Sequence, residues 1–145
     1  MARGAIGRAL RLLTAGDEIG ALAAARKTGR DWLFAALSTD SVMRLAEVSA
    51  QKPVGSRGAF SGNLEALAEW LRDLMAVAAG AEEEVADPDA RQWLSRVIAR
   101  KPLHPIGIAR SIERVTEAQF WAQGNVNPQL ILADLLRHMH ADLRL

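Results

Sequence analysis

The sequence predicts an all-α protein, a bundle of six or seven helices joined by short loops. Half of the 145 residues are hydrophobic, which is enough to build a core. Alanine, leucine and arginine dominate, tyrosine is absent and β-branched residues are sparse, so good helix formers prevail. No stretch alternates apolar and polar residues between turn signals, as a half-buried strand would.

The first predicted helices occupy residues 5–14 and 18–37. Gly16 is expected to end the first of them, and Asp17 can cap the second. Gly29 is a further candidate break inside the second. The first helix repeats apolar residues at three- and four-residue spacing, at Ile6, Ala9, Leu10 and Leu13.

Capping residues at 38–40 precede a third helix, predicted over residues 41–51. The clearest interruption of the chain follows at 52–62, where proline, glycine and serine are concentrated and predict a loop. Asn63 then caps a strongly amphipathic helix that Gly80 terminates. The apolar face expected for the third helix is Val42, Leu45 and Val48.

Proline marks the start of each of the last three predicted helices. Asp87 and Asn127 are good N-caps, and each is followed by a proline, whose missing N–H costs nothing at the first helical position. Pro105 opens the helix between them. The expected inward faces are Ala90, Trp93, Leu94, Val97 and Ile98; Ile108, Ile112, Val115, Ala118 and Trp121; and Ile131, Leu132, Leu135, Leu136, Met139 and Leu143.

Overall charge and composition exclude several classes of protein. A formal net charge of +1 provides no field that would attract nucleic acid, a membrane or an acidic substrate. The absence of cysteine excludes a disulfide framework, a thiolate zinc site and a cysteine nucleophile. No apolar run reaches the roughly 18 residues of a membrane span, and arginine interrupts the start where a signal peptide would be apolar. We expect a cytoplasmic protein.

No group of residues in the sequence predicts catalysis, a cofactor or a metal. His138 and His140 are two residues apart on a helix, so their side chains diverge, and the remaining histidine, His104, is distant in sequence. The acidic run 82–84 has the character of a solvated connection. There is no glycine-rich phosphate loop and no serine in a nucleophile elbow.

The tryptophans and arginines could in principle serve nucleic-acid binding. Each tryptophan lies among apolar residues at helical spacing, which favours core or interface packing over base stacking. Arginines occur on most helices without forming one long basic run, and nothing marks the pair Arg8 and Arg11, or the group Arg96, Arg100 and Lys101, as a DNA contact. The four tryptophans are Trp32, Trp70, Trp93 and Trp121.

Three stretches of the sequence carry a resemblance to a known family. They are residues 4–13 (GAIGRALRLL), residues 70–75 (WLRDLM) and residues 124–132 (GNVNPQLIL), the last followed by Leu135 and Leu136. In this order they resemble the C-terminal region of bacterial DNA polymerase III clamp-loader subunits of the delta prime type. The first is similar to the helix that closes the AAA+ lid in that family, the second to an element of its collar domain and the third to the start of its last helix.

The resemblance implies a non-catalytic part of the clamp loader. Residues 1–51 would be the end of the lid and linker helices, 52–62 a loop, and 63–145 a helical collar domain. The collar would bind the gamma/tau and delta subunits in the pentamer that loads the sliding clamp onto primed DNA. The family's nucleotide-binding domain has no counterpart here, so we expect a longer natural protein. Gly7 stands where ATP-hydrolysing relatives carry a nucleotide-sensing arginine, which favours delta prime.

Two other functions remain open from the sequence. The chain could be a gamma/tau collar, or an unrelated helical module that binds DNA or regulates a partner. A DNA-binding module would need a basic face and a recognition helix, and the net charge of +1 argues against it. A small helical enzyme is disfavoured, since no nucleophile, base and oxyanion donor come together in the sequence.

Overall fold

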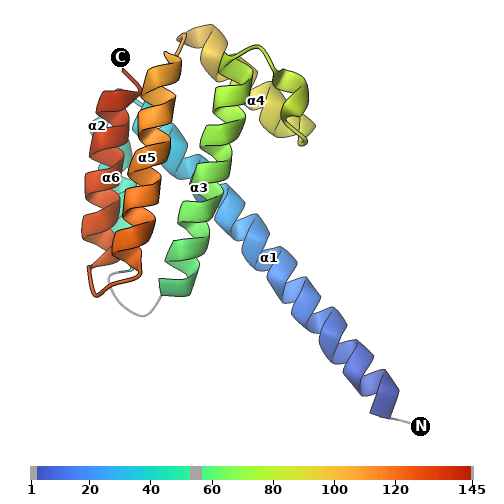
Figure 1. Cartoon of the computed structure of the whole chain (residues 1–145). Coiled ribbons are helices and arrows are strands. Elements are labelled where there is room, and N and C mark those ends of the chain that lie inside the picture. The colour runs from blue at the N-terminus through green and yellow to red at the C-terminus, as the bar shows by residue number, and fades with distance from the viewer. Residues whose placement is uncertain (1–2, 53–56, 145) are drawn as a thin grey trace.

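Six α-helices form the computed structural model, which describes the backbone of residues 3–52 and 57–144 and the side chains of 15–52 and 58–144 (Figure 1). No described residue lies in a β-strand, so the predicted all-α class is confirmed. The helices are α1 (Arg3–Leu37), α2 (Ser41–Ala50), α3 (Arg57–Ala78), α4 (Pro88–Arg100), α5 (Pro105–Ala122) and α6 (Pro128–Asp142), with a 3-10 turn at Glu82–Glu84.

Helix α1 is continuous over 35 residues, so the predicted break at Gly16 and the cap at Asp17 are wrong. A glycine inside a helix costs about 1 kcal/mol relative to alanine. Ending the helix instead leaves terminal N–H and C=O groups that need capping partners. Alanine, the best helix former, fills four of the five positions from 21 to 25, and the helix runs through.

Helix α3 begins at Arg57, so residues 57–62 of the predicted loop are helical, and the prediction that Asn63 caps this helix is wrong because Asn63 lies inside it. Phe60 explains this difference, because its side chain is buried and its ring centroid lies 5.8 Å from that of Trp32. Burying a phenylalanine contributes about 1.5–3 kcal/mol. That gain offsets the roughly 1 kcal/mol that Gly58 and Gly62 each cost as helical residues.

The predicted capping signals of the other helices are confirmed. Asp40, Asp87 and Asn127 are the N-caps of α2, α4 and α6, and each side chain accepts a hydrogen bond from a backbone N–H two residues later. His104 caps α5 in the same way, its Nδ1 accepting from the N–H of Ile106 at 3.2 Å. Gly80, the predicted stop after α3, has a φ of 78°, which glycine tolerates best.

One hydrophobic core joins α3, α5 and α6 to the C-terminal third of α1. These helices pack side by side, while the N-terminal half of α1 projects away from them and α4 lies at the far end of α3 (Figure 1). Trp32, Leu33 and Ala36 of α1 belong to the same core as the residues after the loop, so the core is not divided at 52–62. The largest fully buried side chains are Trp32, Phe60, Leu33, Leu64, Leu67, Leu71, Leu74, Leu94, Ile108, Leu132, Leu136 and Met139.

Two glycines permit close helix contacts. A Cβ on Gly29 would lie 2.9 Å from the backbone nitrogen of Leu67, so α1 crosses α3 there and this glycine does not break the helix as predicted. A Cβ on Gly107 would lie even closer to the backbone carbonyl of Asp142, where the start of α5 contacts the end of α6. Both positions need a residue without a side chain because the neighbouring atom belongs to the backbone.

Helix α2 is oriented differently from the prediction. Of its expected apolar face only Val48 packs against the core, whereas Val42 and Leu45 are each 64% exposed. The helix packs on α1 and α6, and Gln129 at the start of α6 donates a 2.6 Å hydrogen bond from Nε2 to the carbonyl of Gln51.

Across the described residues, no helix has the combination of length and hydropathy required to cross a membrane.

Candidate interaction surface

Four large apolar side chains are exposed where α5 turns into α6, and we call this group the α5–α6 corner. Phe120 and Trp121 belong to the last turn of α5, Val126 to the connection and Leu130 to the first turn of α6. Their exposed fractions are 67%, 49%, 38% and 65%. Single exposed apolar residues are ordinary, but contiguous apolar patches on a protein surface mark interaction sites.

The helical register of α5 places Trp121 outward. From Ile108 onward, the buried positions of this helix are Ile108, Ser111, Val115, Ala118 and Ala122, spaced by three and four residues. Ala122 therefore continues the inward face, and Trp121, about 100° away around the helix, does not. The prediction that Trp121 faces inward is wrong because a spacing of three or four residues after Ala118 allows either position 121 or position 122, and Ala122 is the buried one.

A shallow groove between α5 and α6 continues from the corner. Ala118, Ile131 and Leu135 are buried and form its floor, and Trp121 also lines it. The groove is thus apolar and can accept one or two apolar side chains of a partner.

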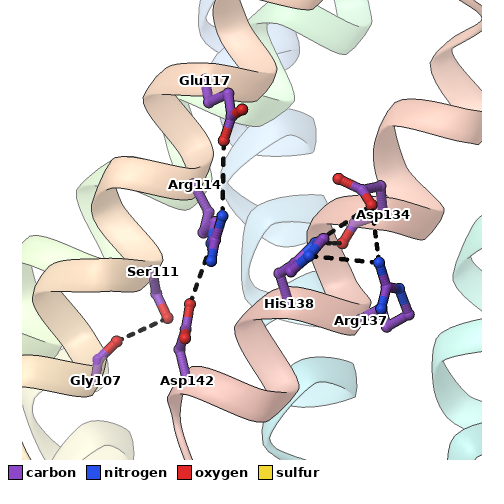
Figure 2. Close-up of polar contacts among 8 residues, drawn as sticks. All are labelled: Gly107, Ser111, Arg114, Glu117, Asp134, Arg137, His138 and Asp142. Carbon is purple, nitrogen blue, oxygen red and sulfur yellow. Dashed lines mark hydrogen bonds and ion pairs between the residues drawn. The ribbon is translucent and has the colours of Figure 1, made fainter.

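Charged side chains border this groove on both helices (Figure 2). On α5, the Arg114 guanidinium lies 3.4 Å from an Asp142 carboxylate oxygen and 3.9 Å from a Glu117 oxygen. On α6, the Asp134 carboxylate lies 3.3 Å from both Arg137 and His138. These partly exposed pairs add little stability, and they give the apolar groove the polar rim typical of protein interfaces.

The described polar side chains near the corner bond to neighbouring groups of the fold. Ser111 is buried, and its hydroxyl donates a 3.0 Å hydrogen bond to the carbonyl of Gly107, one turn earlier (Figure 2). The Asp134–His138 pair resembles part of a triad, but the His138 Nδ1 lies 2.8 Å from the backbone carbonyl of Asp134 and its Nε2 3.4 Å from Arg137. None of these three contacts of His138, with Asp134 O, Asp134 Oδ1 and Arg137, is to a nucleophile.

The three histidines lie in separate environments. His104 caps α5, and His138 borders the groove. His140 is half-buried: its Nδ1 lies 2.9 Å from the carbonyl of Ala36, and its Nε2 lies 3.3 Å from Arg144. Within the described ranges, no three histidine or carboxylate side chains come together in a way that could hold a metal ion.

Three of the four tryptophans pack as predicted. Trp32 and Trp70 are buried, and Trp93 lies against Trp70 with ring centroids 5.3 Å apart. The guanidinium of Arg26 on α1 stacks on the face of the Trp70 ring, with its carbon 3.7 Å from the ring centroid. The Trp70 indole N–H donates to the Arg26 carbonyl at 2.8 Å, and the guanidinium pairs with Asp73 at 2.8 Å. These rings tie α1, α3 and α4 together and are not free to stack on bases.

The remaining charged groups named from the sequence are dispersed. Arg96 and Arg100 are exposed on α4, and Lys101 is its C-cap. Residues 82–84 form the short 3-10 turn, and the side chains of residues 8 and 11 lie outside the described part.

Burial raises the pKa of the Glu47 carboxyl on α2, and the charge of Asp31 raises it further, while Lys27 lowers it. Both charged groups that act on Glu47 belong to α1.

Sequence reasoning did not find the corner as an exposed surface, although it named Trp121. A signal was present, since Phe120 is a second large apolar residue beside Trp121 and does not belong to the inward face predicted for this helix. Comparison with known proteins adds no identification: no family model matches the chain, and neither a curated protein nor a solved structure is significantly similar to it.

Proposed function

We propose that this chain is a non-catalytic assembly module of the clamp-loader collar type, and that its α5–α6 corner binds a neighbouring subunit. The exposure of Phe120, Trp121 and Leu130 on one corner is the observation that carries the proposal. A fully exposed aromatic side chain presents 150–250 Å², so these two rings alone offer roughly 250 Å² of apolar surface. Burying that area is worth about 6 kcal/mol before the costs of association.

The clamp-loader part of the proposal rests on the resemblance of three sequence stretches. One of them, residues 124–132, forms the connection and first turn that carry Val126 and Leu130, so it coincides with the corner. Another, residues 70–75, lies in α3, where Trp70, Leu71 and Leu74 are buried. By this proposal the partners are the gamma/tau and delta subunits, and the assembly loads the sliding clamp onto primed DNA in the cytoplasm.

The polar rim supports a subunit contact over an enzymatic site. Arg114 and Asp134 are each satisfied by neighbouring charges around an apolar floor. An interface needs this combination, in which apolar anchors supply affinity and rim charges select the partner. Acid–base chemistry would need a titratable group aimed into a cleft beside a nucleophile, and the contacts of His138 do not provide one.

Co-elution with purified clamp-loader subunits of the same organism tests the proposal. The chain should form a complex with gamma/tau, with delta or with both, detected by size-exclusion chromatography and native mass spectrometry. Trp121→Ala should weaken that complex by roughly 30-fold, the loss of about 2 kcal/mol expected for an interface anchor.

Phe34→Ala is the matched control, because Phe34 on α1 is also 49% exposed but lies outside the corner. It should leave the affinity unchanged. Failure to bind any clamp-loader subunit would contradict the clamp-loader role. Equal affinity of the Trp121→Ala variant and the wild-type chain would contradict the role of the corner.

A further inference from the structure

A second exposed surface lies in the angle between α1 and α3. The first two thirds of α1, residues 3–24, project beyond the bundle, and we call this segment the arm (Figure 1). All side chains from 15 to 24 are exposed, including Ile19 at 67% and Leu22 at 71%. An isolated helix gains little stability from propensity alone, so an apolar arm of this length is expected to be covered.

The arm and the N-terminal half of α3 enclose a broad groove, the α1–α3 groove. Its walls carry mainly small or apolar residues, namely Ala21, Leu22 and Ala25 of α1 and Ala59, Gly62 and Ala66 of α3. Small residues on both walls let a third helix approach closely, because the distance between helix axes follows the size of the side chains at the contact.

Carboxylates border the groove. Glu18 projects from α1, and Glu65 and Glu69 from α3. Glu69 lies 3.8 Å from the guanidinium of Arg26. Among the described residues, Glu18 and Glu65 pair with no basic side chain. The groove is therefore apolar inside and negatively charged at its edge, and suits a basic, apolar helix.

The chain contains such a helix in the outer part of its own arm. Residues 3–14 are helical and include arginine at 3, 8 and 11 with no acidic residue. Between these arginines the sequence is apolar, with Ile6, Leu10 and Leu13 at helical spacing. The outer arm thus matches the α1–α3 groove in both charge and hydrophobicity.

We propose that two copies of this chain exchange arms, residues 3–14 of each lying antiparallel to α1 in the groove of the other. A two-fold axis beside Ala15 and Gly16 places residues 3–14 of one copy opposite residues 17–28 of its partner. The groove extends along α1 from Glu18 to Thr28, which matches this length. The small residues at the axis allow the two α1 helices to cross closely. This self-association is independent of the subunit contact proposed for the α5–α6 corner.

Charge reversal provides the test, read by sedimentation velocity and equilibrium across a concentration series of the full chain. The wild-type chain should dimerise. A groove variant, Glu18→Arg with Glu65→Arg, and an arm variant, Arg8→Glu with Arg11→Glu, should each be monomeric. Each variant reverses four contacts per dimer, and at about threefold per surface pair the Kd should rise roughly a hundredfold.

An equimolar mixture of the two variants distinguishes loss of charge matching from loss of folding. In a mixed dimer the acidic arm meets the basic groove and the basic arm meets the acidic groove, so both contacts are restored and a heterodimer should form. A control variant, Glu83→Arg with Glu113→Arg, makes the same charge change at exposed positions outside the groove and should dimerise like the wild type. A wild-type chain that remains monomeric at every concentration would overturn the proposal, as would two variants that stay monomeric when mixed.

Discussion

Replacing Gly29 by alanine should destabilise the protein although alanine is the better helix former. The new Cβ would lie 2.9 Å from the Leu67 nitrogen, 3.0 Å from the Ala66 carbonyl carbon and 3.2 Å from the Ala66 Cβ. The first two are backbone atoms of α3, so neither can move without displacing a helix that carries much of the core. Relief of the clash requires α1 and α3 to separate at their crossing point.

Two opposing effects set the size of the loss. Alanine gains about 0.5–1 kcal/mol in helix propensity over glycine. Overpacking a tight contact costs about 1–3 kcal/mol, and the upper part of that range applies where backbone must move. The free energy of unfolding should therefore fall by about 1–2 kcal/mol, which for a domain of this size corresponds to a decrease in Tm of roughly 3–6 °C.

Gly20→Ala is the matched control on the same helix. A Cβ at Gly20 meets no atom within 4 Å, so only the gain in propensity remains. Urea unfolding followed by circular dichroism should show the Gly20→Ala variant at least as stable as the wild type and the Gly29→Ala variant less stable. If the Gly29→Ala variant proved as stable as the Gly20→Ala variant, α1 and α3 would not cross at this residue.

Three further predictions concern side chains elsewhere in the fold. Because the folded-state pKa of Glu47 is raised, the charged form is disfavoured in the native state, and stability is lost as pH rises from the ordinary value of 4.5 through the raised pKa. Glu47→Gln should thus be more stable than the wild type at pH 7 and lose that advantage below pH 4.5, as measured by thermal unfolding at several pH values. A double-mutant cycle of Arg26→Met and Asp73→Asn in urea should give a coupling of about 0.5–1 kcal/mol, since the pair is only partly buried; zero coupling would show that the 2.8 Å ion pair does not stabilise the fold. Leu45→Ala should change the free energy of unfolding by less than about 0.5 kcal/mol, whereas Leu64→Ala, at a fully buried position, should lower it by about 2–5 kcal/mol. If Leu45→Ala lowered the free energy of unfolding as much as Leu64→Ala, Leu45 would face inward, as first expected for α2.

Local capping chemistry accounts for what the sequence predicted well. Helices α4, α5 and α6 begin at the prolines named from the sequence, and Asp87 and Asn127 make the expected capping hydrogen bonds. These signals depend on a few adjacent residues, so tertiary structure has little influence on them. The stop at Gly80 is of the same kind.

The errors have a tertiary origin. Gly29 was a candidate break, and residues 57–62 an expected loop, because glycine lowers helix propensity. In the structure Gly29 lies where α3 approaches most closely, and Phe60 anchors the first turns of α3 in the core. Both effects depend on a helix far away in sequence. The spacing of apolar residues along the sequence reveals neither the contact at Gly29 nor the burial of Phe60.

The exposed surfaces show a second limit. The spacing of Val42 and Leu45 correctly indicates an apolar face on α2, but it cannot tell whether another part of the chain covers that face. The same holds for Trp121 on α5, where helical spacing after Ala118 suggested burial. The absence of catalytic and metal-binding residues remains a prediction about function.

Hydrogen exchange in the presence of each clamp-loader subunit tests the assembly role most directly. Amides in the last turn of α5, the connection at 123–127 and the first turn of α6 should exchange more slowly when gamma/tau or delta is added. The Trp121→Ala variant should lose this protection, while the Phe34→Ala variant keeps it. Unchanged exchange of the corner with every clamp-loader subunit at saturating concentration would contradict the proposed function.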